Sequence, residues 1–159
     1  MELQTATRLR PAIHVLLVED NPADARLTTY SLGASSVPLN VSLVTNGDEA
    51  LAFLRREGRY RSAAAPDLVL LDLNMPKKNG FETLMEIRKD PKLSSIPVLI
   101  LTSSDDEADV ARSYSLQANA YLVKPFGIEK FSPVVKAVED FWFKTAKLPP
   151  RDVAQQNRE

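Results

Sequence analysis

The chain has 159 residues, of which 20 are basic and 21 are acidic, so its formal net charge is −1. This balance excludes the basic surface that binding to nucleic acid or to an anionic membrane requires. The absence of cysteine excludes disulfides and thiolate metal sites. The sequence has no signal peptide and no run near the ~18 apolar residues of a membrane span, so we expect one cytoplasmic domain.

Five short segments have the length and the composition of β-strands. Three of them are almost entirely apolar, which is typical of strands buried on both faces of a parallel sheet. The second and fifth segments are weaker, and we expect them nearer the sheet edges. In chain order, the predicted strands are Ile13–Val18, Val41–Thr45, Leu68–Leu71, Val98–Leu101 and Ala120–Val123.

Helix signals lie between the predicted strands. Asn21 followed by Pro22 is typical of an N-cap and the first helical position. Ser104 and Glu107 have the spacing of a capping box. The predicted helices follow Asn21, run from Asn46 as N-cap through Leu54, from Phe81 to Lys89, and from Ser104 through Gln117.

The sequence leaves the start of the last helix open. Pro133 falls inside the expected helix, where it would remove a backbone donor. The conflict disappears if Ser132 is the N-cap and Pro133 the first helical residue, after a separate short turn at Ile128–Phe131.

Alternating strands and helices predict an α/β fold, a five-stranded parallel sheet with helices on both faces. We expect an N-terminal extension at 1–11, a single domain at 12–145 and a C-terminal arm at 146–159. In such sheets, ligands bind at the carboxyl ends of the strands.

Polar residues follow the carboxyl ends of four predicted strands. They are Glu19 with Asp20, Asp72, Thr102 and Lys124. Each is common at a strand end for structural reasons, but the parallel topology brings all of them to one edge. Clustered carboxylates repel one another, and oxygen ligands suit Mg²⁺, with Asp20 and Asp72 as ligands. A carboxylate such as Asp72, facing a metal-neutralised phosphoryl group, can act as a nucleophile.

At these residues the sequence resembles a known family. The segments LLVEDNP, LLDLNMPKKNG, VLILTSS and YLVKPF look like the four signatures of response regulator receiver domains. The resemblance covers about residues 12–145 and implies a flavodoxin-like sheet of order 2-1-3-4-5. The spacing from Asp20 to Asp72 is longer than in many receivers, and we assign the surplus to the 57–66 loop.

The resemblance also implies a role for each matching residue. Asp72 would accept the phosphoryl group, Lys124 would contact its oxygens, and Thr102 would be the switch hydroxyl. Tyr121 would be the switch aromatic that turns inward when Thr102 engages the phosphoryl group. The remaining implied roles are Mg²⁺ binding by Asp20 directly, by Glu19 through water and by the Asn74 carbonyl, a cis bond at Lys124–Pro125, and a tight loop at Gly80.

Other functions fit the sequence less well. Nucleotide binding lacks a glycine-rich phosphate loop. A phosphatase with an aspartate nucleophile usually has a second aspartate two residues on, where this chain has Asn74. A receiver that binds partners without phosphorylation normally lacks one of the acid, threonine or lysine positions, and all are present.

We therefore expect a stand-alone response regulator, not a turnover enzyme, that takes its phosphoryl group from a histidine kinase. A receiver cut from a longer regulator remains the alternative. The FW pair followed by LPP, with the long 57–66 loop, resembles receivers served by phytochrome-type kinases. An apolar surface near the last helix predicts a homodimer, unless Trp142 folds back onto the domain. The expected interface residues are Val138, Phe141, Trp142 and Leu148.

Overall fold

The computed structural model describes residues 12–150, which form the predicted α/β fold. The five strands are all parallel, in the order β2-β1-β3-β4-β5, as expected. The N-terminal extension at 1–11 and the last nine residues of the predicted arm lie outside the described residues. The elements are β1 (Ile13–Val18), α2 (Pro22–Gly33), β2 (Leu39–Val44), α3 (Gly47–Arg55), the 3₁₀ turn η1 (Gly58–Tyr60), β3 (Leu68–Leu71), α4 (Gly80–Lys89), β4 (Val98–Thr102), α5 (Glu107–Ser115), β5 (Ala120–Val123), α6 (Ile128–Val138) and the π-helical η2 (Glu139–Thr145).

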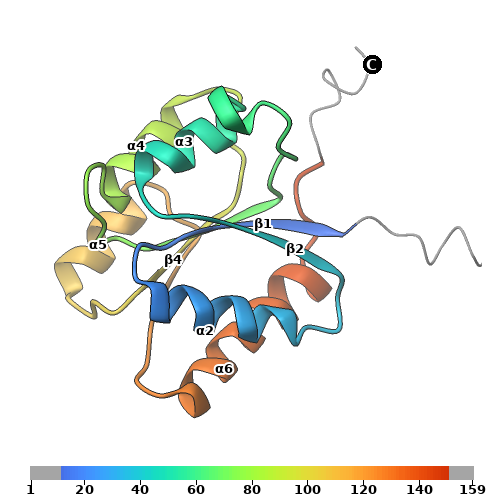
Figure 1. Ribbon diagram of the computed structural model, residues 1–159. Helices are drawn as coiled ribbons and strands as arrows, with labels where there is room; N and C mark the ends of the chain where they lie inside the picture. The colour runs from blue at the N-terminus through green and yellow to red at the C-terminus, as the bar shows by residue number, and fades with distance from the viewer. Residues whose placement is uncertain (1–11, 151–159) are drawn as a thin grey trace, which may run out of the picture.

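The sheet lies between two helical layers, and each layer encloses its own core (Figure 1). Helices α3, α4 and α5 cover one face, and α2 and α6 cover the other. Alternate residues of each strand point to opposite faces, so Leu16 and Val18 join the first core while Val15 and Leu17 join the second. The apolar character of β1 therefore follows from burial on both sides.

Central and edge strands differ in burial as the sequence predicts. Every residue of β3 and β4 is buried, because each of these strands has a neighbour on both sides and a helical layer on both faces. Strands β2 and β5 are edge strands and are only partly buried. Leu43 on β2 and Val123 on β5 are among the exposed apolar residues.

Asn21 and Asn46 are confirmed as N-caps, whereas Ser104 and Ser132 are not N-caps. The Asn21 and Asn46 side chains accept hydrogen bonds from Asp24 N–H and Glu49 N–H, at 3.0 and 2.9 Å. Helix α5, in contrast, is capped by Asp106, whose carboxylate accepts from the Ala108 N–H.

Ser104 does not open α5, and no capping box forms there. Its hydroxyl donates instead to the Asp109 carboxylate, at 2.7 Å. Helix α5 also ends at Ser115, earlier than predicted, because Gln117 adopts a left-handed conformation with φ 71°.

Pro133 lies inside α6 rather than at its first position. The helix begins at Ile128, and the predicted separate turn at Ile128–Phe131 is its first turn. Pro133 removes one backbone hydrogen bond, but Phe131, Val135 and Val138 of the same helix are buried in the second core. The free energy gained by burying this apolar face outweighs the loss of the backbone hydrogen bond at Pro133.

The chain after α6 packs against its own domain. Glu139, the first residue of η2, is buried and accepts hydrogen bonds from the backbone and hydroxyl of Ser36, both at 3.2 Å. Lys144 lies 3.4 Å from the same carboxylate. Burial opposes ionisation, yet hydrogen bonds from the Ser35 side chain and the Ser36 backbone, with the ion pair to Lys144, hold the pKa of Glu139 below its usual value. Glu139 thereby ties η2 to the loop between α2 and β2.

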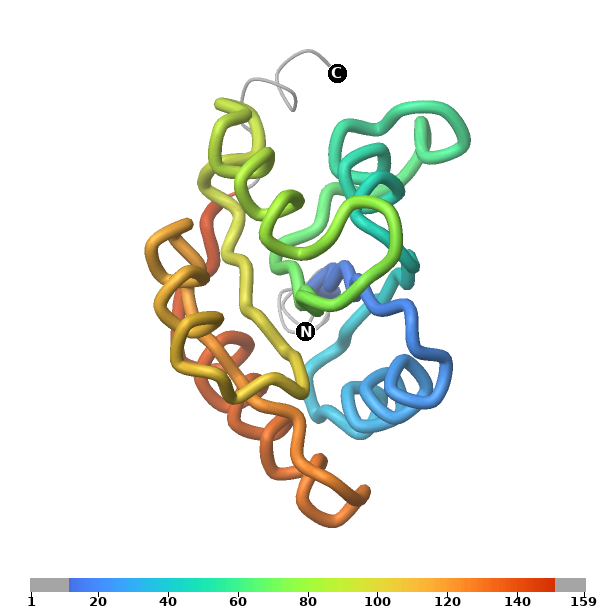
Figure 2. The backbone as a smooth tube through the Cα atoms, turned by 90° about the vertical axis from the view of Figure 1, so that its left-hand side faces the viewer, coloured from blue at the N-terminus to red at the C-terminus, as the bar shows by residue number. Residues whose placement is uncertain are grey.

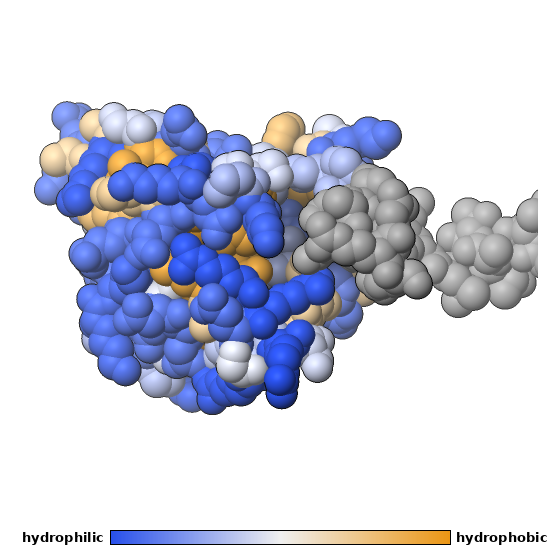
Figure 3. All heavy atoms as spheres, turned by 90° about the horizontal axis from the view of Figure 1, so that it is seen from above, coloured by the Kyte–Doolittle hydropathy of each residue, from blue (hydrophilic) through white to orange (hydrophobic). Residues whose placement is uncertain are grey.

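The surface over the α3–α5 layer is largely hydrophilic, with small apolar areas between polar side chains (Figure 3). Within residues 12–150, no helix has the length and apolarity that crossing a membrane requires.

Candidate functional site

All five strands end at one edge of the sheet, which Figure 2 views end-on. The segments that follow β1 and β3 lie side by side near the centre of this edge. They carry Glu19 and Asp20, after β1, and Asp72, after β3. The register of β1 against β3, which pairs Val18 with Leu71, places these acids next to each other. The prediction that they meet is confirmed.

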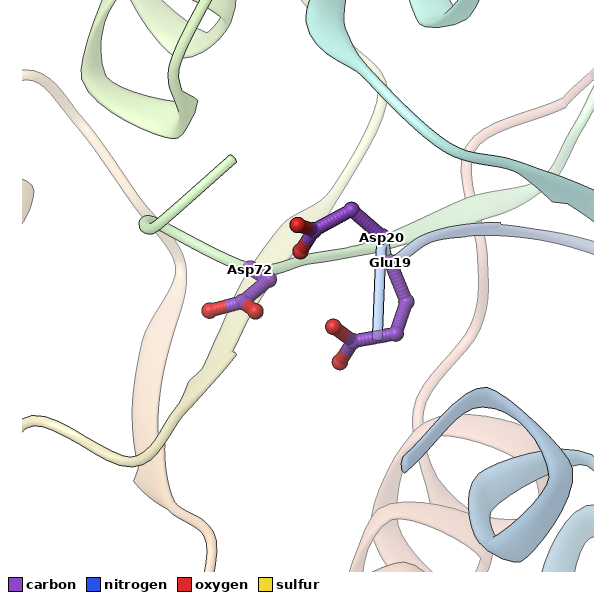
Figure 4. A group of neighbouring side chains, drawn as sticks. All are labelled: Glu19, Asp20 and Asp72. Atoms are coloured by element: carbon purple, nitrogen blue, oxygen red, sulfur yellow. The ribbon is translucent and has the colours of Figure 1, made fainter. Parts of the chain in front are cut away.

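The three acids form a group that fits a divalent cation. Glu19, Asp20 and Asp72 each offer a carboxylate oxygen, and these oxygens lie within 4.8 Å of one another. Figure 4 shows the carboxylates gathered at the ends of β1 and β3. Glu19 and Asp72 are buried, and Asp20 is partly buried. Oxygen donors of this kind suit a hard cation such as Mg²⁺ or Mn²⁺.

Lys124, after β5, places its ammonium among the carboxylates. Its Nζ contacts a Glu19 oxygen and lies 2.9 Å from Asp24 Oδ2 and 3.3 Å from Asp72 Oδ2. Only 6% of its side chain is exposed. Lys124 therefore partly neutralises the acidic group from the opposite side of β3.

Burial and charge alter the protonation of two of these groups. Burial raises the pKa of Glu19 to about 7; Lys124 offsets part of this effect, and the neighbouring Asp72 adds to it. For Lys124, burial lowers the pKa, but the ion pairs with Glu19, Asp72 and Asp24 outweigh burial and leave the pKa raised. Lys124 is therefore a stable positive charge at neutral pH.

The loop after Asp72 is held close to the site. The Asn74 N–H donates to Asp72 Oδ1 at 3.4 Å, and the Gly80 N–H donates to the Leu73 carbonyl at 3.0 Å. Gly80 opens α4 rather than forming a tight loop, and Lys77 is the residue of this loop with positive φ. A Cβ at Gly80 would lie 2.4 Å from the Asp72 carbonyl oxygen, so close approach to the backbone is the reason for glycine.

Thr102 ends β4 and is completely buried. Its hydroxyl is one of three buried side-chain oxygens in residues 12–150 that have no hydrogen-bond partner. A buried hydroxyl without a partner is costly, which makes Thr102 a group that is ready to donate to a new acceptor.

Tyr121 lies on β5, which pairs with β4. Its hydroxyl donates to the Ser104 carbonyl at 2.8 Å, and its ring packs partly against the first core. The structure therefore places Tyr121 beside the segment that follows Thr102.

Two details of the site differ from the sequence predictions. Residues 12–150 contain no cis peptide bond, so the expected cis bond at Lys124–Pro125 is wrong, and the bond has the trans form that is intrinsically favoured. Sequence reasoning also missed Asp24, which lies in the first turn of α2. Its position one turn after Asn21 was the available signal, but its pairing with Lys124 spans 100 residues.

Of the expected interface residues, only Phe141 is well exposed, at 53%. Val138 is buried in the second core, so its prediction as an interface residue is wrong: an amphipathic stripe reports burial but not which surface covers it. Trp142 and Leu148 are partly buried against the same core, so Trp142 folds back onto the domain. Phe141 packs edge-on against Trp142 and is the aromatic of this region that is left for an interface.

Comparison with known proteins decides the family. Residues 15–136 match the response regulator receiver domain. The chain belongs to the response regulator receiver family. It is 43% identical to response regulator Rcp1 of Synechocystis sp. over 135 residues, which are 85% of this chain and 92% of Rcp1.

Solved structures of similar proteins agree with this assignment. The phosphorylated cyanobacterial phytochrome response regulator RcpA is 47% identical, with a TM-score of 0.85 over 88% of this chain and all of that chain. The Mn²⁺-bound form of Rcp1 is 42% identical, with a TM-score of 0.83 over 87% of this chain and 99% of that chain. A bacteriophytochrome response regulator, RtBRR, is 39% identical, with a TM-score of 0.70 over 93% of this chain and 90% of that chain.

Proposed function

We propose that this receiver accepts a phosphoryl group on Asp72 from a histidine kinase. The observation that carries the proposal is the position of Asp72, which lies within a three-carboxylate group and 3.3 Å from the Lys124 ammonium. One Asp72 oxygen attacks the phosphorus and the P–N bond of the phosphohistidine breaks. The histidine nitrogen keeps the electron pair and takes up a proton.

We propose Mg²⁺ as the cation of this site. Asp20 and Asp72 would hold it directly, Glu19 through water and Asn74 through its carbonyl. Support comes from the three gathered carboxylates and from the existence of an Mn²⁺-bound structure of Rcp1. The cation supplies charge neutralisation for the phosphoryl oxygens.

We propose that Thr102 and Tyr121 convert phosphorylation into a change of surface. The Thr102 hydroxyl would donate to a phosphoryl oxygen, as its burial without a partner suggests. Tyr121 would then leave the Ser104 carbonyl and turn inward. Phosphorylation shifts such an equilibrium only as far as the phosphoryl group binds the two states differently, and Thr102 is placed to supply that difference.

The phosphorylation proposal is tested with acetyl phosphate and Mg²⁺. Wild type should gain one phosphoryl group by intact mass, and the label should be trapped at Asp72 by hydride reduction. Removal of Mg²⁺ with a chelator should abolish the gain. Asp72→Asn is expected to remain unlabelled, and Asp48→Asn, an exposed acid at the start of α3, is the control for charge. Equal labelling of Asp72→Asn and wild type contradicts the assignment.

We propose that this regulator acts as a stand-alone receiver in the cytoplasm and is not a turnover enzyme. The chain matches 92% of Rcp1, so its similarity extends over nearly the whole of that regulator, which supports the stand-alone assignment. The output of such a receiver would be protein contact or onward phosphotransfer. RcpA and RtBRR are phytochrome and bacteriophytochrome response regulators, which supports a phytochrome-type kinase as the phosphoryl donor. Phosphotransfer from such a kinase that is faster than from an unrelated kinase would bear this out.

We also propose a homodimer through η2 and the arm that follows it. Phe141 is the exposed aromatic of this region, and the Trp142 ring beneath it is fixed by the second core. A second copy that covers Phe141 would remove a large apolar side chain from water.

The dimer is tested by sedimentation at high micromolar concentration, with and without beryllofluoride and Mg²⁺. Wild type should sediment as a dimer and Phe141→Glu as a monomer. Tyr30→Glu is the control, because Tyr30 is also exposed but lies on α2. Truncation after Asp140 would be a poorer test, because it also removes Phe143 from the second core. A wild-type monomer under both conditions overturns the proposal.

A further inference from the structure

Asp24 is the one carboxylate on Lys124 that lies outside the cation-binding group. Lys124 Nζ contacts Glu19, Asp24 and Asp72. Glu19 and Asp72 belong to the group of acids that fits a cation, whereas Asp24 comes from the first turn of α2. Oxygens that hold a cation are less available to an ammonium. Asp24 is therefore the partner of Lys124 that a bound cation would not also engage.

A phosphoryl group on Asp72 would compete with Asp24 for this ammonium. A lysine ammonium has three donors, and all three carboxylates already engage the Lys124 Nζ. Phosphorylation turns the Asp72 contact of Lys124 into a contact with the phosphoryl group, whose charged oxygens can accept from a second donor of the ammonium. A second such contact would replace Glu19 or Asp24. The Asp24 side chain is 37% exposed, against 2% for Glu19, so water replaces the lost contact more easily at Asp24.

We propose that Asp24 is a positioning residue that holds Lys124 in the unphosphorylated protein and is released when the phosphoryl group takes the ammonium. This inference rests on the proposed phosphorylation of Asp72. It adds a second route out of the site, through α2, to the route through Thr102 and Tyr121.

The place of Asp24 in the fold couples its release to α2. Its own N–H donates to the Asn21 cap, so the carboxylate belongs to the turn that begins the helix. Helix α2 packs against α6 on the same face of the sheet. The buried hydroxyls of Thr28 and Ser31 on α2 are, with Thr102, the three in residues 12–150 without a hydrogen-bond partner. Neither of those two side chains holds α2 by a hydrogen bond.

The first test measures the affinity for beryllofluoride at saturating Mg²⁺ by calorimetry. Asp24→Asn removes the competing charge and should bind the analogue about threefold more tightly, the size expected of a partly exposed ion pair. Asp24→Glu restores the carboxylate and should return the affinity toward wild type. Glu107→Gln is the matched control, because Glu107 is an exposed first-turn acid of α5 at the same edge of the sheet. Its affinity should equal that of wild type.

The second test measures amide resonance shifts, which would not change if Asp24 had a merely structural role. In wild type, beryllofluoride should shift the amide resonances of residues 24–28 as Lys124 leaves Asp24. In Asp24→Asn these shifts should disappear, while those at Thr102 and Lys124 persist.

The outcomes separate this inference from the proposed function. Failure of beryllofluoride to bind wild type, or equal binding to Asp72→Asn, overturns the proposed function. If wild type and Asp24→Asn bind beryllofluoride with the same affinity and show the same amide shifts in α2, the role of Asp24 is overturned. The proposed function is unaffected by that result.

Discussion

Replacement of Lys124 with methionine is expected to lower the free energy of unfolding by about 3 kcal/mol when divalent cations are absent. The reason is that Glu19 and Asp72 are almost fully buried and Lys124 is their buried cationic partner. Methionine keeps most of the side-chain volume, so the loss reports charge rather than a cavity. Urea unfolding in the presence of a chelator measures it.

Millimolar Mg²⁺ should restore much of this loss. A cation that binds only the folded state adds stability through mass action, and it adds more where the carboxylates lack the lysine. The gain on adding Mg²⁺ should therefore be larger for Lys124→Met than for wild type.

Lys136→Met is the control for this prediction. Lys136 pairs with Asp140 one helical turn away at an exposed position, so its loss should cost no more than about 0.5 kcal/mol with or without Mg²⁺. If Lys124→Met is as stable as wild type in the chelator, the carboxylates do not depend on this ammonium, and the electrostatic account of the site is wrong.

The sequence was sufficient for the sheet and for the group of acids after β1 and β3. Strands buried on both faces need unbroken apolar runs, and Leu68–Leu71 is such a run. Parallel strands have their carboxyl ends at one edge, so Asp20, Asp72 and Lys124 had to approach one another once the sheet was correctly inferred. Periodicity and topology together predicted this part of the site.

Local signals were insufficient where several residues competed for one role. The segment Ser103–Glu107 holds two serines and three acids, and any of the first four side chains has the chemistry of an N-cap. Asp106 caps α5 because Ser104 is engaged by Asp109. Pro133 is similar, since its local preference for a helix start yields to the burial of Phe131 and Val135.

Contacts between distant segments were also beyond the sequence. The pairing of Asp24 with Lys124 depends on how the first turn of α2 lies against the end of β5, and no pattern within either segment encodes it. The burial of Val138 is of the same kind, because a stripe of apolar residues on a helix fits a core and an interface equally well.

Thr102→Val should separate stability from signalling. The Thr102 hydroxyl is buried without a partner, so an apolar side chain of the same shape should leave the unphosphorylated protein as stable as wild type or up to about 1 kcal/mol more stable. The affinity for beryllofluoride should fall about tenfold, because a hydrogen bond to a charged group is worth about 1.5 kcal/mol or more. Thr102→Ala should show the same loss with an added cavity cost.

The decisive readout is Tyr121. At saturating beryllofluoride, wild type should show a large shift of the Tyr121 amide resonance as the Tyr121 hydroxyl leaves the Ser104 carbonyl, and Thr102→Val should not. Labelling of Asp72 by acetyl phosphate should persist in the variant, because the carboxylates and Lys124 are intact.

Two threonines provide matched controls for the Thr102 prediction. Thr28 is also fully buried with an unpartnered hydroxyl, but it lies on α2, so Thr28→Val should be equally well tolerated and should keep the Tyr121 response. Thr83 is fully buried too, but its hydroxyl donates to the Asn79 carbonyl at 2.8 Å. Thr83→Val should therefore lower the free energy of unfolding by about 1 kcal/mol. A full Tyr121 response in Thr102→Val would show that the signal leaves Asp72 by another route. The Lys124–Asp24 contact would then be the next route to test, because it joins the site to α2 and the proposed phosphoryl group would break it.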